Sequence, residues 1–303
     1  MTEVLRIATR QSRLALWQAQ WVARLLSDAH PDLVVELVPM TTEGDRRLDD
    51  SLAKIGGKGL FIKELEVAML EGRADLAVHS MKDVPAQMPD GFHIAAVLPR
   101  EDPRDALVSG KVSGIDALAQ GAVVGTSSLR RQSQLKHKRP DLDIRPLRGN
   151  VDTRLAKLDA GDYDAIILAA AGLKRLGFDE RIAEFIGTDV SLPAAAQGAV
   201  GIECLSDAAA VTKRIAVLND DACARALAAE RSFCLALGAS CTSPVAALAT
   251  LHDNEVSLTA RVAAPDGTTL LEETTRGDDG GTVGEQTAKA LIDRGALALL
   301  DIA

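Results

Sequence analysis

The sequence predicts an α/β protein in which two α/β domains are followed by a third, smaller α+β domain with an antiparallel sheet and helices. Strands and helices alternate in the first part of the chain, the same alternation restarts after Arg104, and the tail changes to short strands joined by a hairpin turn. A chain of 303 residues also exceeds one comfortable hydrophobic core. The predicted boundaries are 1–98 plus 199–217 for the first domain, 104–192 for the second and 221–303 for the third.

The first domain is expected to contain a largely parallel sheet, because helices connect its strands. Ser12 is positioned to cap the first helix, since a serine hydroxyl can accept a hydrogen bond from the amides of the first turn. Apolar periodicity predicts strands over 4–9, 33–38 and 75–79 and helices over about 13–27 and 60–70.

The second domain resembles the first in the order and size of its elements, after a linker at Pro99–Arg104. Thr126-Ser-Ser128 leads into one helix and Asn150 caps the next. The expected elements are strands over 122–125, 142–146 and 163–170 and helices over 129–138 and 151–160.

The last third of the chain differs from the first two domains in its expected secondary structure, which includes antiparallel strands. Pro265-Asp-Gly267 indicates a hairpin turn between two strands. The expected elements are a strand over 199–203, helices over about 207–218 and 220–236, antiparallel strands over 243–250, 255–264 and 268–275, and a last helix over about 283–299.

Composition excludes several classes of function. The net charge of −9 argues against a general nucleic-acid or anionic-membrane surface. Apolar runs do not reach membrane-spanning length and the N-terminus has no signal-peptide core, so we expect a cytoplasmic protein. The four cysteines form no C-x-x-C pair and there are five histidines, so we expect no metal site and reduced thiols.

Ser80-Met-Lys-Asp83 follows a short buried strand. Ligands bind beyond the carboxyl ends of strands in open α/β sheets, because the loops that leave the strands converge there. This stretch supplies a hydroxyl donor, a cation and an acid or base. By itself it is equally compatible with a solvated surface turn.

Positive charge is concentrated in residues 125–154, which hold eight Lys or Arg against three Asp. An arginine at a helix N-terminus is unfavourable unless an anion occupies the site, because the helix dipole is positive there. The pattern predicts a cleft for a ligand with several carboxylates or phosphates, bound by bidentate guanidinium groups. The arginines at such positions are Arg10, Arg130, Arg131, Arg148, Arg154 and Arg175.

Gly56-Gly-Lys-Gly59 is not a nucleotide-binding loop. Leu52 occupies the first glycine position of a P-loop, and Gly59 follows Lys58 where Ser or Thr is required. The loop is better interpreted as a mobile lid that carries Lys54 and Lys58.

Cys241 lies in a turn of small residues, Leu237-Gly-Ala-Ser-Cys-Thr-Ser-Pro244. The residue type leaves a buried, inert thiol and a functional thiol equally open. With no histidine nearby in sequence, a Cys/His hydrolase is only weakly indicated.

Several of these motifs together resemble the porphobilinogen deaminase (hydroxymethylbilane synthase) family, nearly from end to end. The phrases that carry the resemblance are Arg-Ile-Ala-Thr-Arg10-Gln-Ser, Lys54-Ile-Gly-Gly-Lys-Gly-Leu-Phe61, Val-His-Ser-Met-Lys-Asp83-Val-Pro, Arg-Glu-Asp-Pro-Arg-Asp105, Val-Gly-Thr-Ser-Ser-Leu-Arg130-Arg131, Leu-Arg148-Gly-Asn-Val-Asp-Thr-Arg154, Ala-Gly-Leu-Lys-Arg175-Leu-Gly and Gln197-Gly-Ala-Val-Gly-Ile-Glu.

The resemblance implies two periplasmic-binding-protein-like α/β domains and a smaller α+β domain that attaches a cofactor. It implies a transferase that joins four porphobilinogen units head to tail, releases ammonia, and yields linear hydroxymethylbilane for porphyrin and haem biosynthesis. It further implies a dipyrromethane cofactor bound through a thioether to the cysteine that corresponds to Cys241. Each pyrrole carries an acetate and a propionate, which suits an arginine-lined cleft.

The resemblance also implies residue roles. Asp83 would be the catalytic group, stabilising the azafulvenium-like cation left when ammonia departs and shuttling protons. Cofactor-binding residues would be Ser80, Lys82, Thr126, Ser128, Arg130 and Arg131; substrate-binding residues Arg10, Ser12, Gln18, Arg148, Arg154, Arg175 and Gln197; and lid residues Lys54, Lys58 and Phe61.

Two positions depart from the family. Ala239-Ser240 stands where Gly-Gly usually precedes the cofactor cysteine, and Ala196 stands where Gly often precedes Gln197. Chain growth needs room, so we expect hinge motion at about 99–103 and 193–198. The partners implied are porphobilinogen and the growing polypyrrole chain, without nucleic acid, membrane or metal, in a monomer. The alternative is a two-lobed binding module for a carboxylate ligand, without catalysis.

Overall fold

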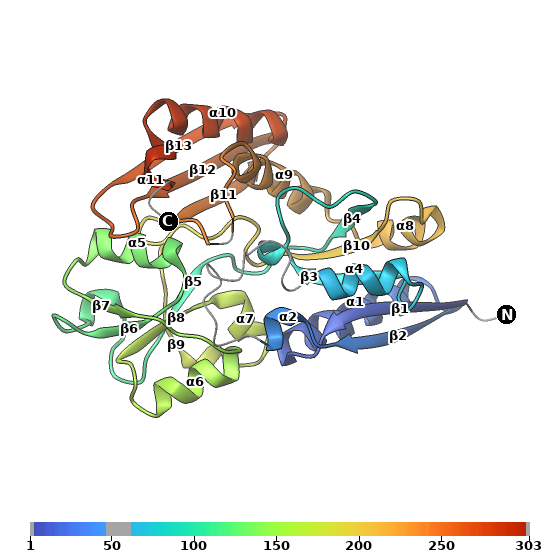
Figure 1. Ribbon diagram of the computed structural model, residues 1–303, viewed down its shortest axis with the longest axis horizontal. Helices are drawn as coiled ribbons and strands as arrows, with labels where there is room; N and C mark the ends of the chain where they lie inside the picture. The colour runs from blue at the N-terminus through green and yellow to red at the C-terminus, as the bar shows by residue number, and fades with distance from the viewer. Residues whose placement is uncertain (1–2, 47–61, 241, 301–303) are drawn as a thin grey trace.

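The computed structural model describes residues 3–46, 62–240 and 242–300 and contains three sheets (Figure 1). The first sheet has the strand order β2-β1-β3-β10-β4. β1 pairs in parallel with β2 and β3, whereas β10 runs antiparallel to β3 and β4. The predicted largely parallel sheet is therefore confirmed, with β10 as its exception. The bounds are β1 Glu3–Arg10, β2 Leu33–Met40, β3 Leu76–Ser80, β4 Phe92–Val97 and β10 Val200–Leu205.

The second sheet repeats this plan in the order β7-β6-β8-β5-β9, with β5 antiparallel to β8 and β9. The fourth strand is β10 in the first sheet and β5 in the second. Each of these two strands follows a connection that comes from the other sheet. The strands β4, β5 and β9 are not among the predicted elements, although strands of similar length such as β3 and β8 are. The bounds are β5 Asp105–Val108, β6 Val123–Gly125, β7 Asp143–Arg145, β8 Ala165–Ala169 and β9 Ile182–Phe185.

Helices cover these two sheets, and three of them begin at the predicted caps. The side chains of Ser12, Ser128 and Asn150 accept hydrogen bonds from the amides of Ala15, Arg131 and Thr153. The helix bounds are α1 Arg13–Ala29, α2 Glu43–Arg46, α4 Lys63–Leu70, α5 Leu129–Lys138, α6 Val151–Asp159, α7 Ala170–Arg175 and α8 Ala209–Ile215.

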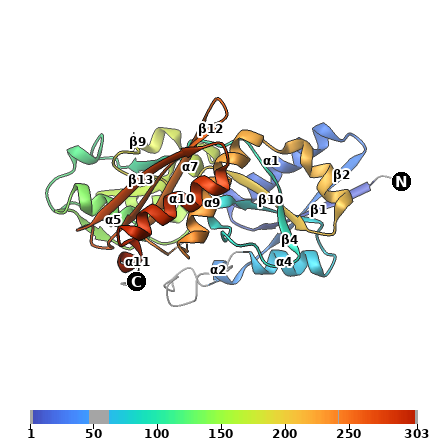
Figure 2. The ribbon, with the colours of Figure 1, turned by 90° about the horizontal axis from the view of Figure 1, so that it is seen from above.

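The third sheet is antiparallel, as predicted, in the order β11-β12-β13. Helices α9 and α10 lie side by side on it (Figures 1 and 2). They approach closely because Gly284 has no side chain; a Cβ there would lie 2.4 Å from the carbonyl oxygen of Ala229. The bounds are α9 Asp221–Ala236, β11 Val245–His252, β12 Glu255–Ala263, β13 Leu270–Gly277, α10 Gly280–Asp293 and α11 Ala296–Leu300.

The single last helix predicted over 283–299 is wrong, since the chain forms α10 and α11 instead. The break falls at Gly295, whose φ of +92° lies outside the helical region and suits glycine.

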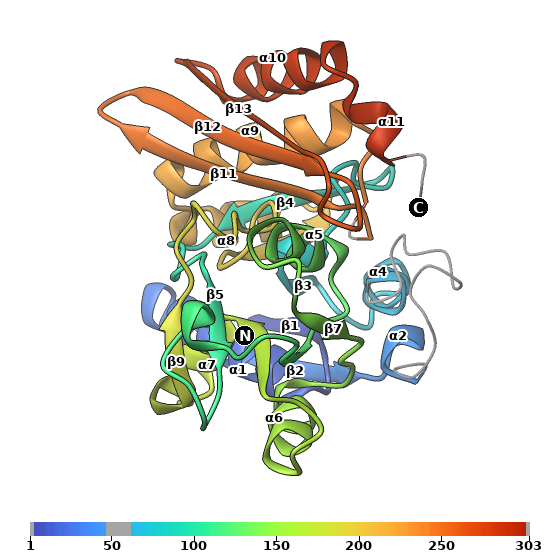
Figure 3. The same cartoon turned by 90° about the vertical axis from the view of Figure 1, so that its left-hand side faces the viewer.

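The chain passes between the first and second sheets twice, between β4 and β5 and again between β9 and β10. In Figure 1 the first sheet lies to the right, the second to the left and the third above them. Figure 3 shows the third sheet above both from another side. Within the part of the chain that the structure describes, no helix is long and apolar enough to cross a membrane.

Candidate active site

Ser80, Lys82 and Asp83 lie where β3 ends, in the short 3-10 turn Met81–Asp83 and just before it. Ser80 is fixed from the facing helix α1, because the amide of Gln18 donates to the Ser80 hydroxyl at 2.8 Å. Gln18 itself is buried on the inner side of α1. The end of β3 is therefore attached to α1.

A cavity of about 100 Å³ opens beside this strand end, between the first and second sheets. Its lining residues include no Asp or Glu among the residues described. The candidate residues that the structure brings together around this cavity are Gln18, Ser80, Lys82, Arg131, Arg154 and Arg175. Four of these six side chains are cationic, so positive charge predominates in the part of the lining that the structure describes.

Burial lowers the pKa of the basic groups around the cavity. Desolvation is the largest cause in each case, and it brings the pKa of Lys82 to about 8 and those of Arg154 and Arg175 to about 10. The charge of Asp83 raises the pKa values of Lys82 and Arg154, against burial. Asp83 is exposed, and its charge opposes the effect of desolvation on both groups.

The side chains of Arg154, Arg175 and Lys82 also have N–H donors that form no hydrogen bond within the described part of the chain. Arg154 donates from Nε to the Gly149 carbonyl at 2.7 Å, and Arg175 donates from Nη2 to the Gly198 carbonyl at 2.7 Å. For the Lys82 ammonium, residues 3–46, 62–240 and 242–300 supply no hydrogen bond. An anionic ligand would neutralise these charges and use the remaining donors.

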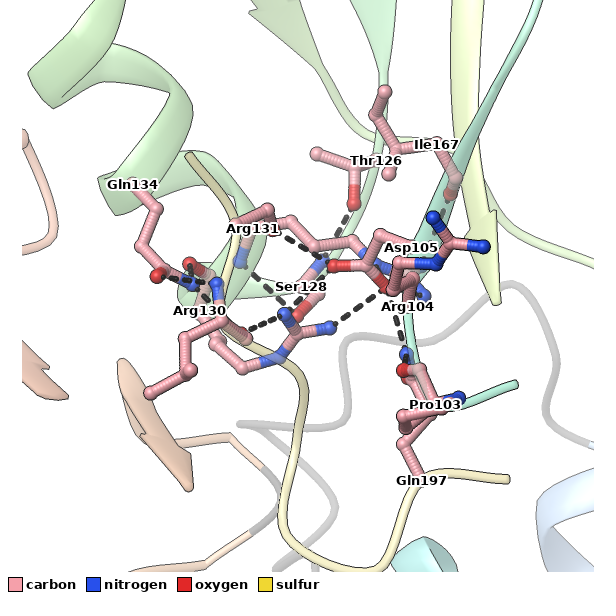
Figure 4. Close-up of polar contacts among 12 residues, drawn as sticks. Pro103, Arg104, Asp105, Thr126, Ser128, Arg130, Arg131, Gln134, Ile167 and Gln197 are labelled. Atoms are coloured by element: carbon pink, nitrogen blue, oxygen red, sulfur yellow. Dashed lines mark hydrogen bonds and ion pairs between the residues drawn. The ribbon is translucent and has the colours of Figure 1, made fainter. Parts of the chain in front are cut away.

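Arg130 and Arg131 converge on the carboxylate of Asp105, the first residue of β5 (Figure 4). Arg130 donates from Nη1 to Asp105 Oδ2 at 2.7 Å, and Arg131 donates from Nε and Nη2 to Oδ1 at 2.9 and 2.8 Å. The Asp105 side chain is fully buried, and the two arginines hold its pKa far below the usual range against the opposing effect of burial. The anion expected at the start of α5 is thus present within the chain itself.

Asp105 also bonds to the connection between β9 and β10. The Ser191 hydroxyl donates to Oδ2 at 2.8 Å, and the Gln197 amide donates to Oδ1 at 3.0 Å and to the Pro103 carbonyl at 2.7 Å. Sequence reasoning missed both Asp105 and Ser191 as site residues. The available signal was a carboxylate placed directly before the apolar run Ala106-Leu-Val108.

Thr126 and Ser128 shape the loop that precedes α5. The Ser128 amide donates to Thr126 Oγ1 at 3.2 Å, and the Ser128 hydroxyl accepts from the Arg131 amide at 3.4 Å. Their hydroxyl groups therefore fix the backbone that carries Arg130 and Arg131.

Eight described candidate residues lie outside the cavity lining: Arg10, Ser12, Asp83, Thr126, Ser128, Arg130, Arg148 and Gln197. Arg10, at the end of β1, forms an ion pair with Asp45. The Ser12 hydroxyl caps α1, accepting from the Ala15 amide at 3.3 Å. Arg148 lies before α6 and its carbonyl oxygen accepts from Lys157.

Lys54, Lys58, Phe61 and Cys241 lie outside the described residues. The residues beside Cys241 form a turn held by hydroxyl groups: the Ser240 amide donates to Ser243 Oγ at 3.1 Å, and the Ser240 and Thr242 hydroxyls are 2.8 Å apart. Ser240, one of the two departures from the family, thus contributes a side chain that glycine lacks.

Ala196, the other departure, has φ of +61°. This left-handed backbone is adopted by glycine without steric cost, which agrees with the glycine that the resemblance leads us to expect at this position. The Ala196 amide donates to the buried carboxylate of Glu230 in α9, so the strained residue is fixed by the third domain.

Comparison with protein families gives two matches that together cover most of the chain. Residues 5–213 match the model described as "Porphobilinogen deaminase, dipyromethane cofactor binding domain", and residues 224–293 match "Porphobilinogen deaminase, C-terminal domain".

Similar solved structures include the periplasmic VFT2 domain of Bordetella pertussis BvgS, with 15% identity over 71% of this chain and 86% of that one and a TM-score of 0.43. The methionine binding protein MetQ has 15% identity over 71% and 89%, with a TM-score of 0.44. A putative methionine-binding lipoprotein from Bacillus subtilis has 10% identity over 71% and 90%, with a TM-score of 0.45. These likenesses are too remote to inform function.

Proposed function

The chain belongs to the porphobilinogen deaminase family, and from this premise we propose how its residues divide the work of the reaction. It is a transferase, a hydroxymethylbilane synthase, which joins porphobilinogen units into linear hydroxymethylbilane with release of ammonia in tetrapyrrole biosynthesis. When bound, its dipyrromethane cofactor supplies the pyrrole carbon to which the first unit is joined.

The cavity of about 100 Å³ at the end of β3 is called the inner cavity from here on. The residues around it fit a cofactor and substrate that carry carboxylates. The cavity has four cationic side chains and, among its described lining residues, no acidic one. Lys82, Arg154 and Arg175 are desolvated and keep donors unused, whereas Arg131 is already paired with Asp105. A carboxylate arm would relieve that desolvation, because bidentate guanidinium–carboxylate pairs are among the strongest polar contacts in proteins. This surplus of buried positive charge is the observation that carries the residue assignments.

Asp83 is proposed as the catalytic residue. Its carboxylate lies beside Lys82 and raises the pKa values of Lys82 and Arg154, so it is close to the cavity yet open to solvent. There it would stabilise the positive charge left on porphobilinogen when ammonia departs and would accept and return the proton. Placed charges and acid–base groups each contribute factors of about 10²–10⁴ in rate.

The remaining roles are proposed from the resemblance of the motifs to the family. We propose that Ser80, Lys82, Thr126, Ser128, Arg130 and Arg131 bind the cofactor, that Arg10, Ser12, Gln18, Arg148, Arg154, Arg175 and Gln197 bind substrate or the growing chain, that Lys54, Lys58 and Phe61 belong to a lid, and that Cys241 forms the thioether. Asp105 joins this set as a positioning residue, because it aligns Arg130 and Arg131.

Domain division and assembly are part of the proposal. The membership of the three sheets supports domains at 1–98 plus 199–217, 104–192 and 221–303.

Hinge motion is also part of the proposal. A cavity of about 100 Å³ holds a few water molecules rather than a chain of pyrroles, so hinge motion at 99–103 and 193–198 would have to widen it. On family grounds we propose a cytoplasmic monomer that needs no metal, to be checked by sedimentation and by activity after chelation.

Intact mass and thiol counting test the cofactor assignment. The purified protein should carry a mass adduct of two linked pyrrole units, absent in Cys241→Ser. A binding module without catalysis would show the mass of the bare chain. After unfolding, the native-sequence enzyme should expose three reactive thiols of the four cysteines in the sequence, since the thioether blocks one.

Ammonia release tests the role of Asp83. Asp83→Ala should keep the fold and lose nearly all turnover, whereas Asp90→Ala, which changes another exposed acid a few residues on, should be active. Normal ammonia release by Asp83→Ala would contradict the catalytic assignment.

A further inference from the structure

A second, larger pocket shares Arg175 with the inner cavity. Its volume is about 590 Å³, within the roughly 300–1,000 Å³ typical of small-molecule sites. It is formed where the start of α1 meets the end of α7, so one wall comes from the first sheet's helices and the other from the second sheet's. We refer to it as the outer pocket.

Arg175 is shared by both spaces. Among the described lining residues it alone lines the inner cavity and the outer pocket. Its Nη2 is held by the Gly198 carbonyl at 2.7 Å, and its guanidinium carbon lies 5.8 and 5.9 Å from the ring centroids of Trp17 and Trp21. The side chain therefore forms a partition that is anchored by one hydrogen bond and two aromatic rings.

The chemistry of the outer pocket suits a flat ring with acidic arms. Trp17 offers an aromatic face, Gln11 and Gln20 offer amide donors, and Arg13 and Arg175 offer positive charge. Arg13 is already oriented by the Asp152 carboxylate at 2.9 Å and the Leu176 carbonyl at 3.2 Å. None of the described lining residues is acidic.

We propose that the outer pocket is a binding site for one incoming porphobilinogen, which waits there before it passes Arg175 to the inner cavity. This inference rests on the proposed function and adds a second substrate site to it. Because the reaction is repeated, each new porphobilinogen must reach the carboxylate of Asp83. The inner cavity, at about 100 Å³, has no room for a second ring that waits its turn.

Charge at the rim of the pocket gives a kinetic test. Gln20→Glu places a negative charge in the pocket on an exposed position of α1. It should raise the KM for porphobilinogen about fivefold at low salt with kcat unchanged, because a near-surface charge contact is worth on the order of 1 kcal/mol. The increase should shrink as salt screens the charge. Gln20→Lys should change KM in the opposite direction.

Ser27→Glu is the matched control. It adds the same charge at another exposed position of α1, about 10 Å further along the helix and outside the pocket. Equal effects of Gln20→Glu and Ser27→Glu on KM would overturn the proposal. All these variants should retain the pyrrole mass adduct, because none of them changes Cys241. If the unmodified protein lacked that adduct, the result would count against the proposed function and not against the outer pocket.

Tryptophan fluorescence gives an independent test. The sequence has two tryptophans, and Trp17 lines the outer pocket whereas Trp21 does not. In an Asp83→Ala background, porphobilinogen should quench fluorescence in a saturable way when Trp21→Phe leaves Trp17 as the reporter. The signal from Trp21 alone, in Trp17→Phe, should change less, because Trp21 does not line the pocket although its ring centroid is 5.6 Å from that of Trp17. Equal quenching in the two variants would rule out the outer pocket as the site.

Discussion

Gly267 in the β12–β13 turn lies directly against His137 of α5. The Gly267 carbonyl oxygen is 2.9 Å from His137 Nδ1, and a Cβ on Gly267 would come within 2.6 Å of the His137 backbone nitrogen. A second contact joins the same two elements, since Arg261 of β12 donates to Gln134 Oε1 at 2.9 Å. The third sheet therefore docks on the helix whose first turn carries Arg130 and Arg131.

Gly267→Ala is expected to disturb this docking. The new methyl group would push the hairpin from α5, and overpacking of this kind typically costs about 1–3 kcal/mol beyond the strain of a positive φ. Because the third domain carries Cys241, turnover and cofactor loading should fall as well. Gly295→Ala is the matched control, since its φ is also positive but nothing lies within 4 Å of its added Cβ. Chemical unfolding and turnover should separate the two variants; identical behaviour would contradict the docking role.

Asp105→Asn should strongly destabilise the protein. The change removes the carboxylate that serves Arg130 and Arg131, and leaving buried charges without their partner typically costs about 3–5 kcal/mol. The pKa of Asp105 is depressed, so its stabilisation is present above the ordinary value of 3.8 and is lost only as pH falls through the lower folded value. Asp293→Asn, in an exposed pair with Lys289, should cost less than about 1 kcal/mol. Urea titration at neutral pH compares the variants, and equal midpoints would show that Asp105 does not organise the arginines.

Binding of carboxylated ligands should weaken as pH rises through about 8. Burial lowers the pKa of Lys82 to about 8, so its ammonium is charged below that pH and neutral above it. In the Cys241→Ser protein, which lacks the cofactor, up to about a tenfold loss in affinity for porphobilinogen between pH 7 and 9 is expected from this group. Lys82→Arg should flatten the profile, because a guanidinium stays charged, whereas Lys138→Arg on an exposed helix end should not.

Unfolding would not explain that loss. Between pH 8 and the ordinary value of 10.5, the unfolded chain holds a proton on Lys82 that the folded chain has released. The unfolded state then binds more protons, so this residue makes the folded state more stable as pH rises. A flat profile in the Cys241→Ser protein would contradict the assignment of Lys82 to the anion site.

Three cysteines should be inert in the folded enzyme. Burial raises the pKa of Cys204, that of Cys223 to about 11 and that of Cys234 to about 12, so few thiolates exist at pH 8. Labelling with a disulfide reagent at pH 8 should therefore be slow until the protein is unfolded. Rapid labelling of any of the three in the native state would contradict this, and peptide mapping would identify which.

The sequence by itself determined the local structure and the identity of the chemistry. Ser12, Ser128 and Asn150 cap their helices because a cap depends on residues three apart in the chain. The order of the motifs pointed to the family, which the family matches confirm. The roles of individual site residues stay predictions.

Only the tertiary structure decided which charges meet. Asp105 reaches Arg130 from 25 residues away and Gln197 from 92 residues away, and neither separation leaves a periodic signal in the sequence. The antiparallel strands β5 and β10 bring these segments together, because each enters one sheet from a connection with the other. Long-range pairing of this kind is set by burial and by the satisfaction of buried charge, which depend on the whole fold rather than on neighbouring residues.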